Sequence, residues 1–244
     1  MIYITRPSPE GDNLTLLLNQ ANIPAKHLPF FNILAGQDLG YLQQQLDNLN
    51  LGDMVIIVSP QVTYMIEQHL PNLRLPNHLR YFAIGKKSAE LFSQQNSVHV
   101  DYPNEENSAG LLSLLNQQSI SGHNALILCG DNGGQQLSQQ LKLQTVNVKT
   151  IACYTRQTIT YKPNILAENI TQQIILITSV DHLLQLDIYC QNKHKRDAQL
   201  IVTSERIFAK AKQLNWQKVL KIVSANNQFL FKTMITLCHN AKNI

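Results

Sequence analysis

A glycine-rich turn follows an apolar run in the stretch ALILCGDNGGQQL, residues 125–137, and turns of this kind can hold a phosphate. A dinucleotide-binding loop needs the pattern G-x-G-x-x-G, but Asn132 stands at the second glycine position, and residues 145–155 supply no acid for a ribose hydroxyl. The Gly-Lys-Ser/Thr of a Walker loop is also missing. Turn amides at the start of a helix still attract an anion, and a carboxylate serves as well as a phosphate. The turn, with Gly130 and Asp131, therefore predicts an anion site.

Hydroxyl groups and glycines recur where the predicted strands end. Each is followed by apolar residues at helical spacing, so each one alone is typical of a helix N-cap. Because the carboxyl ends of parallel strands meet at one edge of a sheet, these residues together favour a cleft rich in anion-accepting amides. The expected ligand therefore carries several carboxylates. The strand-end residues are Thr5, Ser59, Gly85, Gly130, Thr178, Ser179, Thr203 and Ser204.

The elements that position these residues alternate along the chain. Apolar runs of strand length, such as MVIIV at 54–58 and IILI at 174–177, are each followed by an amphipathic segment. Strands that are apolar on both faces and alternate with helices indicate parallel sheets in an α/β fold.

An internal repeat sharpens this picture. Ser59 matches Ser179 and Gly85 matches Ser204 at offsets of 120 and 119 residues, and the opening MIYITRPSPEGDNLTLLL is echoed by NALILCGDNGGQQLSQQL. The chain therefore predicts two similar domains, each a parallel five-stranded sheet flanked by helices.

Composition excludes several classes of protein. The apolar runs are far shorter than the roughly 18 residues of a membrane span, and the N-terminus does not read as a signal peptide, so we expect a cytoplasmic protein without a membrane partner. The four cysteines and eight histidines are dispersed without metal-ligand spacing, so no metal site is expected. The densest basic run, NKHKRD at 192–197, is interpreted as a solvated loop, and nucleic acid is not an expected partner.

An ordered set of short motifs resembles the uroporphyrinogen-III synthase family over essentially the whole chain. No single motif is specific, but the ordered set is hard to obtain by chance. One departure is that Cys129 and Gln135 flank the glycine turn where the family has basic neighbours. The motifs are ITRP (4–7), PFFNI (29–33), VSP (58–60), AIGKKSA (83–89), NSAGLL (107–112), the glycine turn (130–134), YTR (154–156), ITS (177–179) and VTSERIFAKA (202–211).

The resemblance implies a domain arrangement that the repeat alone does not give. In the family, the N-terminal strand and helix join the C-terminal part of the chain, and a two-stranded connector links this domain to the middle one, with a cleft between them. We therefore expect domain 1 at 1–34 plus 157–244 and domain 2 at 38–151. Contiguous halves, at 1–120 and 121–244, are the alternative that the repeat suggests.

The resemblance also implies a reaction. The family's substrate is hydroxymethylbilane, a linear tetrapyrrole polycarboxylate, which loses its terminal hydroxyl as water, closes, and has its last ring inverted through a spiro intermediate. Neither cofactor nor metal is implied, and we expect a monomer. The protein's main task is then to hold a flexible anion in one folded shape, which is catalysis by orientation.

Tyr154 matches the family's tyrosine beside the cleft, where a phenol can donate a proton to the departing hydroxyl; the alternative is a tyrosine that packs on a hinge. Arg156 either holds a carboxylate or caps the connector, and Arg6 either binds substrate or fixes the turn into the first helix. The remaining candidates for substrate binding, taken from motif or position, are Lys86, Ser108, Asp131, Ser204, Arg206, Ala225 and Asn226.

Two rival functions remain open from the sequence. A non-catalytic two-domain protein that binds a polycarboxylate small molecule would present the same amides, and it would differ by binding its ligand without turnover. A nucleotide-using α/β enzyme is weaker, because of Asn132 in the glycine turn.

Overall fold

The computed structural model describes residues 1–131, 133–163, 165–166 and 173–240, with side chains to residue 238. The chain divides into two compact units. The first comprises Met1–Asn32 and Gln157–Ile244, and the second comprises Ile33–Arg156. The chain passes from one unit to the other within strands β3 (Phe31–Ala35) and β7 (Asn147–Thr158), which are neighbours in one sheet.

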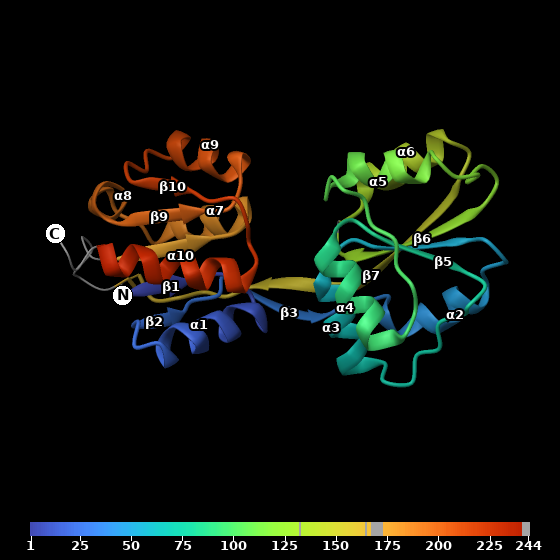
Figure 1. The fold of residues 1–244 in the computed structure, drawn as a ribbon, viewed down its shortest axis with the longest axis horizontal. Helices are drawn as coiled ribbons and strands as arrows, with labels where there is room; N and C mark the ends of the chain where they lie inside the picture. Colours follow the sequence, from blue (N-terminus) through green and yellow to red (C-terminus); the bar gives the residue numbers. More distant parts are fainter. Residues whose placement is uncertain (132, 164, 167–172, 241–244) are drawn as a thin grey trace. The chain divides into compact units, whose positions relative to one another are not determined.

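The first unit is a five-stranded parallel sheet in the order β10-β9-β8-β1-β2, with helices on both faces (Figure 1). Because alternate residues of a strand point to opposite faces, Tyr3 packs in one apolar layer with α7 and α9, whereas Ile2 and Ile4 pack with α1 and α10. The strands are β1 (Ile2–Ile4), β2 (Ala25–His27), β8 (Ile174–Ile177), β9 (Gln199–Val202) and β10 (Val219–Lys221). The helices are α1 (Glu10–Gln20), α7 (Val180–Ile188), α8 (Asn192–Asp197), α9 (Glu205–Gln213) and α10 (Asn227–Asn240).

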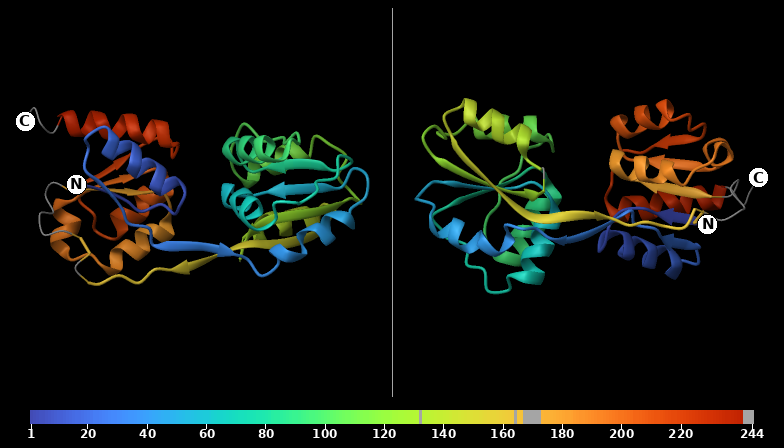
Figure 2. Two further views of the ribbon diagram at one scale, coloured as in Figure 1. Left: turned by 90° about the horizontal axis from the view of Figure 1, so that it is seen from below. Right: turned by 180° about the vertical axis from the view of Figure 1, so that it is seen from behind.

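The second unit is also a five-stranded sheet, in the order β3-β7-β6-β4-β5, with helices on both faces (Figure 2). The strands from β7 to β5 are parallel. The Gly36 amide donates to the Cys153 carbonyl, and the Asp38 amide donates to the Ala152 carbonyl. The residue number thus increases on one side while it decreases on the other, so the chain that continues from β3 runs antiparallel to β7. The other strands are β4 (Met54–Ile57), β5 (Arg80–Ala83) and β6 (Asn124–Gly130), and the helices are a 3-10 helix (Leu39–Tyr41), α2 (Leu42–Asp47), α3 (Pro60–His69), α4 (Lys86–Asn96), α5 (Ser108–Leu115) and α6 (Gln135–Leu143).

The predicted pair of five-stranded sheets flanked by helices is thus confirmed, but the second sheet is not wholly parallel as predicted, because its edge strand β3 is the segment that enters the unit and it runs antiparallel to β7. The shared strand order supports the internal repeat. Strands β9, β8, β1 and β2 follow one another in the first sheet as β5, β4, β6 and β7 do in the second. Even the outer strand β10 has a counterpart, since Asp101 forms a parallel bridge to Phe82 at the outer edge of β5. The strands, and the helices that begin at their ends, are therefore arranged in the same order in both units.

The interpretation of residues 192–197 as a loop was wrong, because they form the short helix α8. Gln191 and His194 cap its first turn reciprocally. A charged pair links the helix to α7, since Lys195 Nζ lies 2.7 Å from Asp187 Oδ1, whereas Arg196 pairs with Asp197 within α8 itself. The loop interpretation depended on the position of this charged run between an apolar segment and a strand-like run, but the buried ring of His194 supplies an inward contact for a helix.

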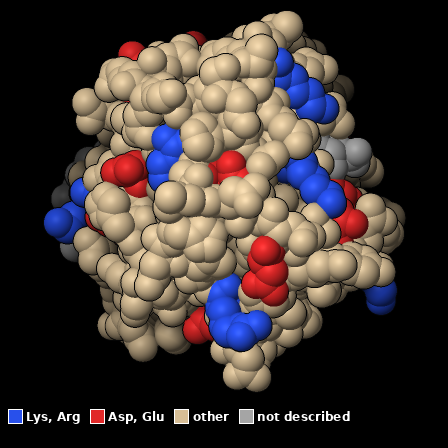
Figure 3. All heavy atoms as spheres, turned by 90° about the vertical axis from the view of Figure 1, so that its right-hand side faces the viewer, with Lys and Arg blue, Asp and Glu red and all other residues tan. Residues whose placement is uncertain are grey.

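Charges of both signs are interspersed among uncharged atoms on the face that Figure 3 shows. None of the described helices has the length and apolar character required to span a membrane. Within the same described residues, no group of three or more His, Cys, Asp or Glu side chains could hold a metal ion.

Candidate functional site

The glycine turn joins β6 to α6, and Tyr154 of β7 packs directly against it. An irregularity in the pairing of β6 with β7 places Gly130 opposite Tyr154. A Cβ added at Gly130 would lie 2.6 Å from Cε2 and 2.7 Å from Cζ of the Tyr154 ring, so the close approach requires glycine. The amide of Asp131 donates a hydrogen bond of 2.9 Å to the Tyr154 carbonyl, whereas Asn132 lies outside the described residues. The structure therefore brings three of the predicted site residues together.

The phenol of Tyr154 is not committed to any described residue. Its side chain is largely buried, at 4 % exposure, and belongs to the apolar layer that includes Ile151 and Cys153. None of the described residues forms a hydrogen bond with its hydroxyl, so the structure shows no protein acceptor that takes its proton. A buried, fixed ring with an available proton is suited to general acid catalysis.

The start of α6 is suited to an anion. Its cap residue Gly134 has a φ of 70°, in the left-handed region that glycine adopts without strain, and no side chain of the described residues caps the first turn. The amides of that turn lie at the positive end of the helix dipole. Burial, together with the nearby Asp38 and Asp131, raises the pKa of the Cys129 thiol to about 11, so this neighbour of the turn is uncharged at neutral pH.

At the start of α4, a residue that the sequence reasoning missed occupies the predicted anion position. The amide of Lys86 donates a hydrogen bond of 3.0 Å to Oε2 of Glu106, and a side chain at Gly85 would overlap the Glu106 carboxylate. The Lys86 ammonium lies 3.6 Å from Glu90 instead. Glu106 lies about twenty residues after Gly85 in the sequence. The only sequence signal for it is the pair of acidic residues before NSAGLL, which does not indicate a contact with Gly85.

Several predicted hydroxyls serve as helix caps. Ser59, Ser179 and Ser204 accept amide hydrogen bonds from Gln61, His182 and Ile207 at 3.2, 3.2 and 3.4 Å, at the starts of α3, α7 and α9. These serine oxygens lie at strand ends, where the predicted ligand would meet them, and each is already the acceptor for one helix amide.

Thr5, Thr178 and Ser108 lie in less suitable surroundings. Thr5 is fully buried, and its hydroxyl donates to the Leu176 carbonyl at 2.7 Å, so that proton is committed to the sheet. The Thr178 oxygen lies 3.4 Å from Nδ1 of His182. Ser108 is the first residue of α5, whereas the cap is Asn107, whose Oδ1 accepts from the Gly110 amide at 2.9 Å.

Arg6, Ala225 and Asn226 come together in the first unit. Arg6 Nη1 donates to the Ala225 carbonyl at 2.8 Å and to Oδ1 of Asn227 at 2.6 Å. Oδ1 of Asn226 accepts from the amide of Gln228 at 2.8 Å and so caps α10. The guanidinium therefore ties the turn after β1 to the start of α10, a link that joins residues about 220 positions apart. Asn227 was missed, because nothing in the sequence pairs it with Arg6.

The two remaining predicted arginines are exposed. Arg206 lies in the first turn of α9, and Arg156 lies on β7, two residues beyond Tyr154. Both side chains are long enough for the guanidinium to reach an anion in solvent.

Comparison with known proteins gives one consistent result. The family model described as "Uroporphyrinogen-III synthase HemD" matches residues 12–226. Among curated relatives, a uroporphyrinogen-III synthase of Proteus mirabilis is 35 % identical over 163 residues, which is 66 % of this chain and 82 % of that protein. The enzyme of that name from Escherichia coli strain K12 is 29 % identical over 96 % of this chain and 99 % of its own.

Solved structures show the same fold. The crystal structure of a uroporphyrinogen-III synthetase from Helicobacter pylori 26695 aligns over 97 % of this chain and 98 % of its own, with a TM-score of 0.64 and 12 % identity. A mutant uroporphyrinogen III synthase from the extremely thermophilic bacterium Thermus thermophilus aligns over 98 % of both chains, with a TM-score of 0.60 and 11 % identity. At 11–12 % identity these structures establish similarity of fold only.

Proposed function

The chain belongs to the uroporphyrinogen-III synthase family, whose members are lyases of tetrapyrrole biosynthesis, and we propose how its own residues carry out that activity. The substrate is hydroxymethylbilane, which loses its terminal hydroxyl as water, closes into a macrocycle and emerges with its last pyrrole ring inverted. The observation that carries the proposal is the family match over residues 12–226. The geometry around the glycine turn supports the following mechanism.

The substrate must bind before it reacts, and the amides at the start of a helix supply binding groups for its carboxylates. The first turn of α6, where Gly134 has no side chain to cap the helix, offers amide donors to a substrate carboxylate. Several such contacts hold a flexible chain in one folded shape and so remove much of the entropic barrier to ring closure. Neutral hydrogen-bond donors suit this role, because they restrain a polyanion without requiring a buried charge.

Tyr154 then assists departure of the hydroxyl. Its phenolic proton passes to the leaving oxygen as the carbon–oxygen bond breaks, and the pyrrole nitrogen of that ring supplies the electron pair that replaces the bond. Water leaves, and the phenolate recovers its proton later in the cycle, when the new macrocycle loses one. Gly130 lets the ring of Tyr154 pack against the turn, so the acid on β7 lies beside the turn that leads into the carboxylate-binding amides of α6.

A direct assay tests the activity. Purified protein is mixed with freshly prepared hydroxymethylbilane, without nucleotide or added metal, and the isomers of the product are separated after oxidation. We expect the type III isomer, whereas uncatalysed closure gives type I. If folded protein gives only type I at the uncatalysed rate, the enzymatic proposal fails, and the rival of a non-catalytic polycarboxylate-binding protein takes its place.

We also propose that the protein acts as a monomer in the cytoplasm. The dispersed cysteines support a reducing compartment, and all four are free thiols in the structure. Multi-angle light scattering on the purified chain tests the oligomeric state: a mass near 27.6 kDa is expected, and a mass of twice that value at working concentration would exclude the monomer.

A further inference from the structure

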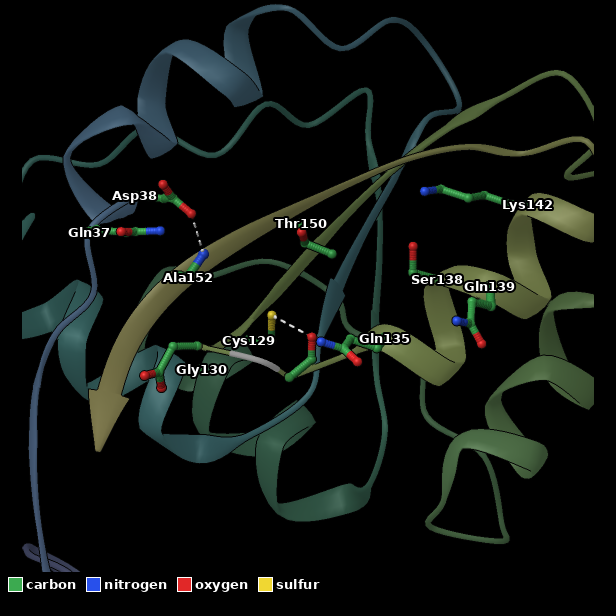
Figure 4. Close-up of a pocket in the computed structure, with 12 residues that line it drawn as sticks. Gln37, Asp38, Cys129, Gly130, Gln135, Ser138, Gln139, Lys142, Thr150 and Ala152 are labelled. Carbon is green, nitrogen blue, oxygen red and sulfur yellow. Dashed lines mark hydrogen bonds between the residues drawn. The ribbon is translucent and has the colours of Figure 1, made fainter. Parts of the chain in front are cut away.

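A groove lies between α6 and β7 in the second unit, beside the glycine turn (Figure 4). Its volume is about 420 Å³, within the roughly 300–1,000 Å³ of small-molecule sites. One wall is a stripe of α6 residues at positions i, i+3, i+4 and i+7, which share one side of a helix. The other wall comes from β7 and from the loop before α2. The polar side chains that line it include Gln135, Ser138, Gln139 and Lys142 on α6, Thr150 on β7, Asp38 in the loop and Asp131 in the glycine turn.

Most of this polar lining is uncommitted. Within the described part of the chain, no hydrogen bond or ion pair engages the side chains of Gln135, Ser138, Gln139, Lys142 or Thr150. Figure 4 shows the amino group of Lys142 extending from α6 toward β7, on the side of Thr150. A nearby lysine behaves differently, because Lys149 Nζ donates to Oε1 of Gln45 at 2.5 Å.

The charges in the groove are separated along its length. Lys142 and the amides of Gln135 and Gln139 lie along α6, whereas the two lining carboxylates lie off that helix, Asp38 in the loop and Asp131 in the glycine turn. Oδ2 of Asp131 accepts a hydrogen bond of 2.7 Å from the Thr155 hydroxyl. One Asp38 oxygen, Oδ2, accepts from the Ala152 amide at 3.0 Å, and no described residue donates a hydrogen bond to the other, Oδ1. The Cys129 thiol beside them is neutral, because burial and these two carboxylates raise its pKa to about 11, so it adds no further negative charge.

A ligand that fits this pattern has carboxylate arms at one end and an N–H donor at the other. A pyrrole ring with acid side arms has both features, and a flat ring of this size fits the groove volume. A free phosphate or nucleotide would match Lys142 but would be repelled by Asp38, because like charges at short range disfavour binding.

We propose that this groove is a subsite for one pyrrole ring of the substrate, in which a carboxylate arm binds Lys142 and the ring N–H donates to Asp38. The proposal rests on the function proposed above. It adds a cationic contact from the far end of α6 to the amide contacts of the glycine turn, and it makes Lys142 a determinant of substrate affinity.

The kinetic test compares Lys142→Gln with Lys149→Gln, which makes the same change of charge at a lysine that does not line the groove. We expect Lys142→Gln to raise the KM for hydroxymethylbilane roughly tenfold, the usual effect of one hydrogen bond to a charged group, with kcat little changed. Lys142→Glu should raise it further. Lys149→Gln should leave KM within about twofold. If the wild type makes type III product and Lys142→Gln has the same KM, the subsite is refuted while the enzymatic function stands.

A binding test separates failure of the subsite from failure of the function. The full chain is titrated with a monopyrrole that bears one acetate and one propionate arm, and backbone amide shifts are followed by NMR. We expect the Ser138 and Thr150 amides to shift in the wild type and in Lys149→Gln, with the response lost in Lys142→Gln. Absence of any shift at these amides in the wild type would overturn the proposal, whatever the outcome of the activity assay.

Discussion

Gly130→Ala should damage both stability and activity, because the new methyl group enters the space of the Tyr154 ring. The added Cβ would lie 2.6 and 2.7 Å from two ring carbons, about 1 Å closer than the roughly 3.5–4.0 Å of a normal carbon contact. The backbone at Gly130 does not have a positive φ, so the clash, and not backbone strain, carries the effect. The ring must therefore move by about 1 Å.

The size of the effect follows from this displacement. The ring is almost fully buried in the apolar layer of the second unit, so overpacking should cost about 1–3 kcal/mol of unfolding free energy. For a unit of this length, about 4 °C per kcal/mol is expected, which lowers the melting temperature of that unit by roughly 4–12 °C. A catalytic group misplaced by about 1 Å can lose on the order of a hundredfold in turnover.

Calorimetry and the isomer assay measure the two effects. Gly40→Ala is the matched control, because a Cβ at Gly40 meets no atom within 4 Å. In a Tyr154→Ala background the methyl has room, so the stability cost of Gly130→Ala should fall to near zero in a double-mutant cycle. If the cost is the same with and without the Tyr154 ring, the contact described here does not explain the need for glycine.

Three further predictions test other parts of the structure. Tyr154→Phe should lower turnover by roughly tenfold to ten-thousandfold while the residual product stays type III, and near-normal turnover would make Tyr154 a packing residue only. Arg6→Gln should lower the free energy of unfolding in urea by about 1–3 kcal/mol, because it removes the hydrogen bonds to Ala225 and Asn227. Arg206→Gln, at an exposed arginine, serves as the control, and equal stability of the two variants would contradict a stabilising link from Arg6 to the start of α10. Burial acts to raise the pKa of Asp53, but hydrogen bonds from Asn124, Asn50 and His123 outweigh it and hold the pKa below 3.8. The ionised carboxylate therefore adds to the free energy of unfolding above pH 3.8, and this contribution is lost as the pH falls through the pKa of the folded state. Asp53→Asn should therefore be less stable than the wild type by roughly 2–4 kcal/mol at pH 7, and a difference that does not shrink in urea unfolding at still lower pH would refute the assignment.

The alternation of strands and helices could be predicted because it depends on local patterns. Runs such as residues 54–58 are apolar on both faces, and the strand β4 that they contain is buried between two apolar layers. The location of candidate residues at strand ends could be predicted for the same reason, because each strand is followed in the sequence by a helix. The helix α8 was missed because its contacts with the rest of the unit come from charged groups and one histidine ring, which no apolar period reveals.

Partners from distant segments could not be predicted, and the two glycines at strand ends show why. The sequence places Gly85 and Gly130 at the ends of predicted strands, yet it does not say which residues lie against them. At Gly85 the occupant is the carboxylate of Glu106, and at Gly130 it is the ring of Tyr154. The second contact depends on a local shift in strand register between Cys129 and Gly130, because a regular ladder would pair Gly130 with Cys153. One strand-end glycine thus makes room for a carboxylate and the other for an aromatic ring, so two positions that look alike in the sequence have different surroundings because different distant segments pack against them.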